Sequence, residues 1–325
     1  MPASPFPPNP MVSLILISWN TRDLLDASLS SVRSQLSEAG GECWVVDNNS
    51  ADGSADMTAE RHPWVNLVRN PANVGFARAC NLVLPRCTQP YVFFFNPDAT
   101  LDPGGLSALC AVMEQNPRLG GLMPRLLNAD GGPTHFVGRA PRIMAARMLV
   151  QRLVIWRFSS SPRVQAWWKR CVEDYLAHSA ISGGPYPRPQ LEGAALMVRR
   201  AALDQVGLFD PGFFCGYEET DLSIRLRKAG WELGVTPLAS VRHWDQQSRL
   251  QWESRPWEIA DGFYFVLKQR GQAALLRHAK RERARLRHFA AAGLAVQEMA
   301  AEQDRVLAAL LDCPEHPGYG AWSPA

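Results

Sequence analysis

Short apolar runs, each followed by a polar turn, recur through the N-terminal part of the chain and constrain its fold most. They are rich in β-branched, aliphatic or aromatic residues, as buried strands are. They lie at 12–18, 42–47, 65–68 and 91–95. Helical periodicity at 24–36 and 76–84 separates them, and loop residues at 52–54 open another helix. Strands that alternate with helices predict an α/β fold with a doubly wound sheet.

After residue 100 the sequence predicts further helices and one more strand. We expect a helix between Leu101 and Gly121 that leads back to the sheet, and a further strand at 192–198. Short helices at 199–206 and 220–229 are each closed by a glycine.

Composition limits the class of protein. With 46% hydrophobic and 20% charged residues, the chain is expected to fold into a globular protein. The seven cysteines are scattered, odd in number and never spaced C-x-x-C, which favours reduced thiols in a cytoplasmic protein over a disulfide framework or a zinc site. No apolar run approaches the length of about 20 residues that spans a bilayer. The expected segments are a disordered leader at 1–10, a folded domain at 11–250 and a helical extension at 251–325, with a long helix or helix pair at 272–311.

Acidic residues and a histidine mark the candidate site. Ligands of doubly wound sheets bind at the carboxyl ends of strands, and Asp98 follows the run at 91–95 directly. A second acidic cluster, Glu218, Glu219 and Asp221, opens a helical pattern, and His243 lies beyond it. Carboxylates and an imidazole can hold one divalent cation and leave a carboxylate free as a base. That combination suits displacement of a phosphorylated leaving group.

These residues belong to an ordered set of short motifs. In chain order they are Ser18-Trp19-Asn20, 45–54, 70–77 with Asn81, Asn96-Pro97-Asp98, 207–214, 218–225, and His243 before Ser248. The set resembles the family 2 glycosyltransferases with the GT-A fold, in particular bacterial rhamnosyltransferase-like members that build surface polysaccharides. It covers residues 12 to 250 approximately. The resemblance implies a mixed sheet with a Rossmann-like N-terminal half.

The resemblance also implies a nucleotide-sugar donor with dTDP or UDP as the nucleotide. Asp47, at a strand end, can accept a hydrogen bond from the imide N–H of the base, and its alternative role is to cap the following helix. Gly75 permits close backbone approach at a helix N-terminus that suits phosphate or sugar hydroxyls, although an ordinary tight turn would look the same. The donor-binding residues that we predict are Asn20, Asp47, Asn48, Ser50, Asn73, Gly75, Asn81, Asn96 and Asp98.

A divalent cation, Mg²⁺ or Mn²⁺, is expected at Asp98, where it would bridge the diphosphate oxygens. The family motif D-x-D has Asn96 in its first position here, so that Asp98 alone carries charge. His243 is the second predicted metal ligand, and its alternative is an ordinary packed histidine beside Trp244.

An inverting transferase needs one carboxylate to take a proton from the acceptor hydroxyl. We favour Glu219, which occupies the position of the family's Asp, and we keep Glu218 and Asp221 as alternatives. A cluster that only caps the helix is the competing interpretation.

Positive charge is unevenly distributed. Eight basic residues and no acidic one lie between Asp130 and Glu173, interleaved with tryptophan and aliphatic residues. We interpret 139–185 as a basic amphipathic insertion that contacts an anionic membrane surface. A solvated basic face is the alternative, and nucleic acid is ranked last because the chain has no nucleic-acid-binding module. The C-terminal helices could serve the same surface or a homo-oligomer contact.

Together these features predict an inverting, metal-dependent enzyme, cytoplasmic or peripheral at the inner face of the membrane. It would move a sugar, with rhamnose from dTDP as the leading candidate, to a saccharide or lipid-linked acceptor. A nucleotidyltransferase would need a glycine-rich, basic loop after the first strand, and Ser18-Trp19-Asn20-Thr21 offers none. A non-catalytic sugar-nucleotide-binding or scaffold subunit is the alternative from another class.

Overall fold

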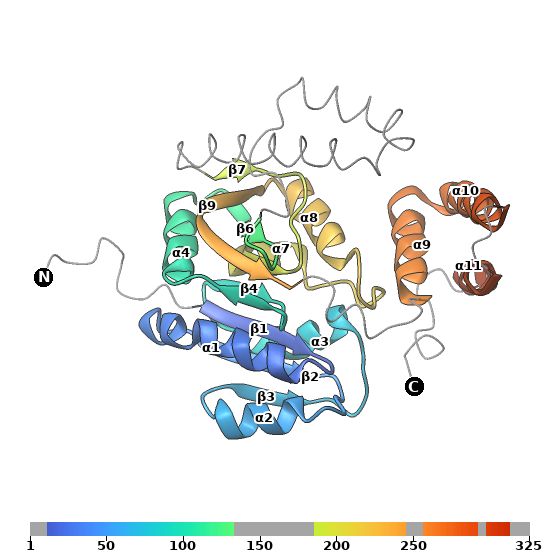
Figure 1. Ribbon diagram of the computed structural model, residues 1–325. Coiled ribbons are helices and arrows are strands. Elements are labelled where there is room, and N and C mark those ends of the chain that lie inside the picture. Colours follow the sequence, from blue (N-terminus) through green and yellow to red (C-terminus); the bar gives the residue numbers. More distant parts are fainter. Residues whose placement is uncertain (1–11, 133–184, 245–255, 292–296, 313–325) are drawn as a thin grey trace, which may run out of the picture.

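A computed structural model describes residues 12–132, 185–244, 256–291 and 297–312 (Figure 1). The predicted leader, most of the basic insertion and Ser248 lie outside these ranges. The strands are β1 (Val12–Ser18), β2 (Glu42–Asp47), β3 (Asn66–Arg69), β4 (Tyr91–Phe95), β5 (Ala99–Leu101), β6 (Leu119–Leu127), β7 (Tyr186–Pro187), β8 (Ala195–Arg199) and β9 (Glu232–His243). The helices are α1 (Arg22–Glu38), α2 (Ser54–Arg61), α3 (Phe76–Val83), the 3₁₀ turn η1 (Leu84–Arg86), α4 (Gly105–Gln115), α7 (Arg200–Val206), α8 (Glu218–Lys228), α9 (Pro256–Arg270), α10 (Gln272–Ala291) and α11 (Gln297–Asp312).

The nine strands of the described residues form one mixed sheet in the order β3-β2-β1-β4-β8-β6-β9-β5, and β7 pairs with β9. The first four strands in this order run parallel to one another. β8 is antiparallel to both β4 and β6, and it joins this parallel half to the parallel pair β6 and β9. The predicted α/β fold with a doubly wound mixed sheet is therefore confirmed. The parallel half places the ends of β1, β2 and β4 at one edge.

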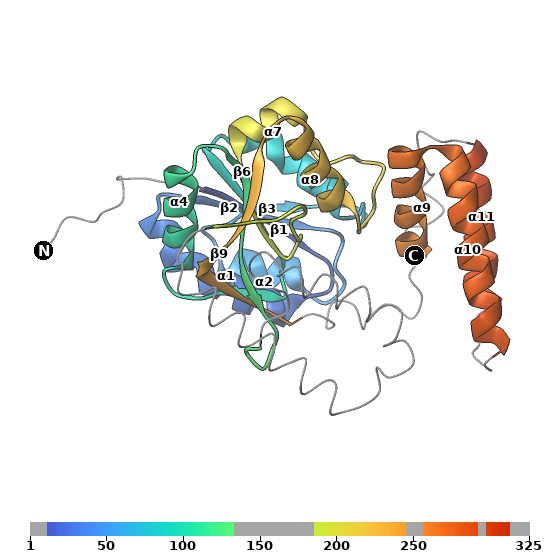
Figure 2. The ribbon, with the colours of Figure 1, turned by 90° about the horizontal axis from the view of Figure 1, so that it is seen from above.

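Helices cover both faces of the sheet. α1, α2 and α4 lie on one face, whereas α3, α7 and α8 lie on the other (Figure 2). With both faces covered, every residue of β1 and β4 is buried. Uninterrupted apolar sequence in these strands follows from that burial.

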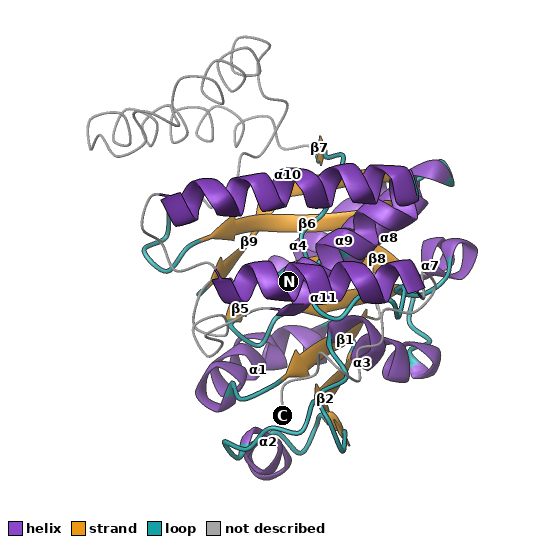
Figure 3. Ribbon diagram, turned by 90° about the vertical axis from the view of Figure 1, so that its right-hand side faces the viewer, coloured by secondary structure: helices purple, strands orange, loops and turns teal. Residues whose placement is uncertain are grey.

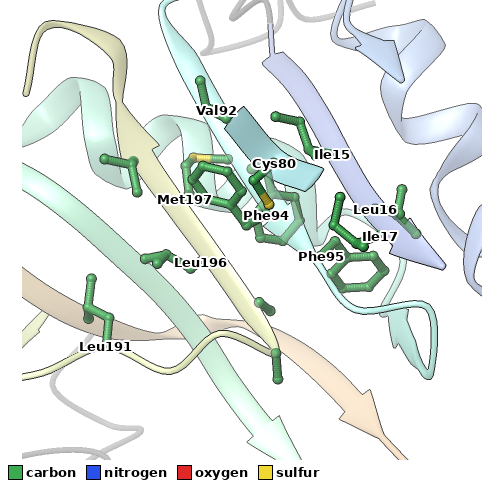
Figure 4. Close-up of a cluster of buried hydrophobic side chains, with 14 of the residues drawn as sticks. Ile15, Leu16, Ile17, Cys80, Val92, Phe94, Phe95, Leu191, Leu196 and Met197 are labelled. Carbon is green, nitrogen blue, oxygen red and sulfur yellow. The ribbon is translucent and has the colours of Figure 1, made fainter. Parts of the chain in front are cut away.

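Four of the largest fully buried side chains lie in β4. Phe93, Phe94 and Phe95 are fully buried. Phe94 lies between side chains of the neighbouring strands β1 and β8 and of α3 (Figure 4), and its ring meets that of Phe209 edge-on, with 4.8 Å between centroids. Each such ring contributes on the order of 2–3 kcal/mol through burial. This packing fixes the strand whose end carries Asp98.

The expected elements between residues 101 and 127 need correction. The helix α4 ends at Gln115, and β6 begins at Leu119, within the stretch that we expected to be helical up to Gly121. β9, which is 12 residues long, was not predicted at all. Both strands contain a proline and deviate from regular pairing, with register shifts near Gly121 and Pro124. These irregularities hide the period-2 pattern that marks a strand.

In its described residues, the C-terminal extension has three helices. α9, α10 and α11 pack on one another, with α10 and α11 side by side (Figure 3). α10 and α11 form the helix pair expected within 272–311, and α9 is an additional helix that the sequence did not single out. In the described ranges, no helix is both long enough and apolar enough to cross a bilayer.

Candidate functional site

Asp47 ends β2 at the edge of the sheet where β1 and β4 also end. Its side chain is only 3% exposed. One carboxylate oxygen, Oδ2, accepts a hydrogen bond from the backbone N–H of Ser50 at 2.9 Å. The other, Oδ1, is buried and has no hydrogen-bond partner in the described structure. A buried oxygen without a donor costs free energy, and Oδ1 has the capacity to accept one further hydrogen bond.

Asn20 and Ser50 tie the two loops beside Asp47 together. The backbone N–H of Asn20 donates to Ser50 Oγ at 2.9 Å. The side-chain Oδ1 of Asn20 accepts from the N–H of Ala51 at 2.7 Å. Asn20 has φ of 52°, a left-handed conformation that asparagine tolerates better than most residues. These contacts shape the loop around Asp47.

Asn48 and Asn73 build the next loop. Asn48 is buried, and its side chain donates to the carbonyl of Gly75 at 3.2 Å and accepts from Asn70 at 2.8 Å. The Oδ1 of Asn73 accepts from the N–H of Gly75 at 3.0 Å. A Cβ on Gly75, whose φ is +81°, would lie 2.4 Å from the carbonyl oxygen of Phe214. Only glycine fits there, because a side chain would collide with the backbone of Phe214.

Asn81 and Asn96 are joined to the rest of the protein in different ways. Both polar groups of the Asn81 side chain bind the backbone of Phe209, at 2.8 and 3.2 Å. Asn81 therefore joins α3 to the segment before α8 and leaves its amide little capacity for a ligand. The backbone of Asn96 bonds to Ala194 at 3.0 Å and to Ala99 at 3.2 Å, which makes the tight turn that presents Asp98.

Asp98 and His243 meet although 145 residues separate them in the chain. Antiparallel pairing of β5 with β9 sets Ala99 opposite His243. As a result, His243 Nε2 lies 3.1 Å from Asp98 Oδ1, and both side chains are largely buried. The carbonyl of Asp98 accepts from the N–H of Trp244 at 2.9 Å.

This pair offers one carboxylate and one imidazole to a cation. Both are suitable ligands for Mn²⁺, and the carboxylate also suits Mg²⁺. Among the described residues, no group of three or more His, Cys, Asp and Glu side chains could hold a metal. A cation at this pair would thus complete its coordination with oxygens from a ligand or water. The residues fit a cation shared with a phosphate group.

Glu218 and Glu219 begin α8 with raised pKa values. Burial is the main cause of the raised pKa of Glu218, and the negative charges of Glu219 and Asp261 add to it. Its Oε2 accepts from the N–H of Gly216 at 2.5 Å. Burial also raises the pKa of Glu219, with a smaller contribution from Glu192. Glu219 is the more accessible of the two carboxylates.

Asp221, the third acid of the cluster, is fully buried and bound on both oxygens. Oδ2 lies 2.8 Å from Arg225 Nε, and Oδ1 lies 2.8 Å from Lys268 Nζ. Gln269 also donates to Oδ1 at 3.1 Å. We therefore rank Asp221 last among the three candidate bases, because both oxygens of its carboxylate belong to an ion-pair network between α8 and α9.

Sequence reasoning missed the part of the site that α9 supplies. Asp261, Lys268 and Gln269 of α9 bind the segment around α8. A signal did exist in the sequence. Asp261 lies just before a run of aromatic and aliphatic residues in a helical stretch, and an acid buried in such a stretch needs partners.

Comparison with known proteins agrees with this geometry. Residues 13–142 match the model of glycosyl transferase family 2. An N-acetylglucosaminyl-diphospho-decaprenol L-rhamnosyltransferase of Mycobacterium tuberculosis is 28% identical over 246 residues, which cover 72% of this chain and 76% of the relative. Residues 13–142 therefore carry the sequence pattern of glycosyl transferase family 2. A pre-mycofactocin glycosyltransferase of the same species is 29% identical over 221 residues, which cover 68% of this chain and 40% of the relative.

Two solved structures have a similar fold. A mannosyltransferase from Pyrobaculum calidifontis in complex with GDP-Man and Mn²⁺ has a TM-score of 0.52 and 17% identity, and the match covers 96% of this chain and 80% of that structure. GalNAc-T7 with UDP, GalNAc and Mn²⁺ has a TM-score of 0.55 and 14% identity, over 79% of this chain. The chain spans about half, 48%, of the length of GalNAc-T7. The expected GT-A fold is thereby confirmed.

Proposed function

We propose that the protein is an inverting, divalent-cation-dependent glycosyltransferase. It moves a sugar from a nucleotide diphosphate to a saccharide or lipid-linked acceptor, with dTDP-rhamnose as the first donor to test. The observation that carries the proposal is the Asp98–His243 pair, which strand pairing assembles at 3.1 Å from distant parts of the chain. The rhamnosyltransferase relative, named for a lipid-diphosphate-linked sugar, supports the choice of donor and acceptor class.

The donor would lie along the edge formed by the ends of β1, β2 and β4. Asp47 Oδ1 accepts the imide N–H of the base, which gives the buried oxygen the partner that it lacks. The loop at Asn73–Gly75 would contact the sugar and phosphates of the donor at the N-terminus of α3. Asn20, Asn48, Ser50 and Asn81 act mainly by holding these loops in place, as their hydrogen bonds to neighbouring loops indicate.

Asp98 and His243 would hold Mg²⁺ or Mn²⁺ beside the diphosphate. When bound, the cation offsets the negative charge that develops on the departing nucleoside diphosphate. Mn²⁺ in the two structurally similar glycosyltransferases supports a cation of this kind.

Glu219 is the proposed base. Its carboxylate takes the proton of the acceptor hydroxyl while that oxygen forms a bond to the anomeric carbon. The bond from this carbon to the diphosphate breaks on the opposite side, so the configuration at the carbon inverts. A raised pKa makes Glu219 a better proton acceptor near neutral pH than an ordinary glutamate. Glu218, more deeply buried and bound to the N–H of Gly216, holds the start of α8 and is the second candidate.

Replacement of the base tests this assignment. In Glu219→Gln we expect kcat to fall by about 10²–10⁴-fold, the usual contribution of a general base. The dissociation constant for the nucleotide should stay within about twofold, because the base contacts the acceptor. Steady-state kinetics with dTDP-rhamnose and calorimetry with dTDP measure the two quantities. Near-full turnover would reassign the base, and NMR of the product's anomeric centre would show whether the configuration inverts.

The acceptor is proposed to be reached at the inner face of the cytoplasmic membrane. The basic insertion at 139–185 lies almost wholly outside the described residues, but α10 presents exposed basic side chains of its own, Arg277, Lys280 and Arg281. Basic residues near an anionic bilayer contribute about 1 kcal/mol each to binding. Sedimentation with phosphatidylserine vesicles tests the proposal, and equal binding to neutral phosphatidylcholine vesicles would contradict it.

A further inference from the structure

α9 binds the turn that leads into the acidic cluster. This turn, Phe213–Tyr217, lies directly before Glu218. Asp261 of α9 is fully buried. Its two carboxylate oxygens accept the backbone N–H groups of Phe214 at 2.9 Å and Cys215 at 2.8 Å. Hydrogen bonds from N–H groups to a buried carboxylate are short and roughly twice as strong as neutral ones.

The next amide of the turn binds a second carboxylate. The N–H of Gly216 donates to Glu218, so three successive amides face two buried carboxylates, one from α9 and one from α8. Tyr217 then adopts φ of 67°, which is unusual for a bulky residue. Such a conformation persists only where the surroundings impose it. Tyr217 stacks on Phe265 of α9, with 5.1 Å between centroids and 25° between planes.

The same turn touches the proposed donor loop. The carbonyl of Phe214 accepts the N–H of Phe76, the first residue of α3, at 2.6 Å. Gly75, just before it, tolerates no side chain against this carbonyl. The peptide group at Phe214 is thus bound by α9 through its N–H and by the donor loop through its carbonyl. A shift of the turn would move the start of α8 relative to the donor.

We propose that Asp261 is a positioning residue of the transferase, which fixes the Phe213–Tyr217 turn and thereby the direction of Glu218 and Glu219 toward the donor. The inference rests on the proposed function for the role of Glu219. Misplacement of a reacting group by about 1 Å can lower a rate by about 10²-fold. α9 is on this account a part of the catalytic unit, although it lies beyond residue 250.

Attachment of α9 does not depend on Asp261 alone. Lys268 bonds to both Asp210 and Asp221, and the hydroxyl of Tyr264 donates to Asp210 at 3.1 Å. These contacts would keep α9 in place when Asp261 is changed. Positioning and attachment can therefore be separated by experiment.

The test compares Asp261→Asn with Asp304→Asn in the full-length chain. Asp304 of α11 is half exposed and pairs with Arg283, so the control makes the same chemical change elsewhere in the extension. In Asp261→Asn we expect kcat with dTDP-rhamnose to fall at least tenfold while the Kd of dTDP stays within about twofold. Amide hydrogen exchange of a peptide covering 213–219 should rise at least tenfold, and that of α10 should be unchanged. Asp304→Asn should match the wild type in each measurement.

Turnover within twofold of the wild type, or unchanged exchange at 213–219, would overturn the inference. If Asp261→Asn does not fold, the Phe265→Leu variant tests the positioning role of α9 instead. This variant removes the stacking on Tyr217 at a partly exposed site, and it should lower kcat at least threefold with the Kd of dTDP unchanged; full turnover would overturn the inference. A wild-type protein that turns over no nucleotide sugar would contradict the proposed function and this inference with it. An active wild type beside a fully active Asp261→Asn contradicts the inference alone.

Discussion

The two carboxylate oxygens of Asp47 have different partners. One accepts the N–H of Ser50, and the other is buried without a hydrogen bond in the described structure. The sequence left two roles open for this residue, a cap for the following turn and a ligand for the base. The geometry is compatible with both, because each oxygen can serve one of them.

Asp47→Asn should weaken binding of dTDP by about tenfold or more, because a hydrogen bond to a charged group contributes about 1.5–3 kcal/mol. Asp56→Asn is the matched control, since Asp56 is 72% exposed and pairs with Arg69 at the surface. Calorimetric titration measures the dissociation constant of dTDP for both variants. Equal affinity in Asp47→Asn and the control would remove Asp47 from the donor site.

The raised pKa of Glu218 predicts that the stability of the protein depends on pH. Folding raises the pKa of Glu218, so the stabilisation from its bound proton is fully present below the unfolded pKa of about 4.3 and is lost as pH rises through the raised pKa. In Glu218→Gln we expect the free energy of unfolding to exceed that of the wild type at neutral pH, by on the order of 1 kcal/mol, and to match it near pH 4. Denaturant titration at several pH values measures it. A difference in the free energy of unfolding between Glu218→Gln and the wild type that does not grow with pH would contradict the raised pKa of Glu218. Glu232→Gln, at an exposed position, is the control.

At the scale of elements, periodicity identified the strands of the parallel half well. β1, β2 and β4 have the predicted bounds because burial on both faces makes their sequences continuously apolar. β6 and β9 were missed because their prolines and register shifts interrupt the alternation. The order of the motifs pointed to Asp98 and His243 as members of one site. The ion pairs of Asp221 could not be predicted in this way, because Lys268 lies in α9, a helix that no motif indicated.

The turn before α3 gives an element-scale prediction. Gly75→Ala should lower the free energy of unfolding by about 2–3 kcal/mol, because the added Cβ would meet the Phe214 carbonyl at 2.4 Å and φ is +81°. Gly53→Ala is a close control. Its φ is +82°, but nothing lies within 4 Å of the added Cβ, so only the backbone cost of about 1 kcal/mol applies. Equal losses in the two variants would show that the approach of Phe214 does not constrain the turn.

At the scale of the whole molecule, α9 joins the C-terminal helices to the transferase domain. Lys268 connects it to Asp210 and to the fully buried Asp221. A buried carboxylate that loses a cation is costly, whereas an exposed pair contributes little. The boundary near residue 250 stays a prediction, and from these contacts across it we propose that the segments on its two sides fold as one unit.

Lys268→Met should lower the free energy of unfolding by about 3 kcal/mol, because a buried charge loses a partner. Arg283→Met, which breaks the exposed pair with Asp304 on α10 and α11, should change it by less than about 1 kcal/mol. Chemical denaturation followed by circular dichroism measures both. Similar small effects in the two variants would mean that α9 is not a stabilising part of the domain.

The most direct test of the proposed function is a calorimetric titration of the full-length protein with dTDP and with UDP, each with and without Mn²⁺, beside the Asp98→Asn variant. We expect that one nucleotide binds, that Mn²⁺ raises the affinity for it at least tenfold, and that Asp98→Asn abolishes this rise in affinity. Failure of both nucleotides to bind with Mn²⁺ present, or a gain from Mn²⁺ that survives in Asp98→Asn, would contradict a nucleotide-sugar site built on the Asp98–His243 pair.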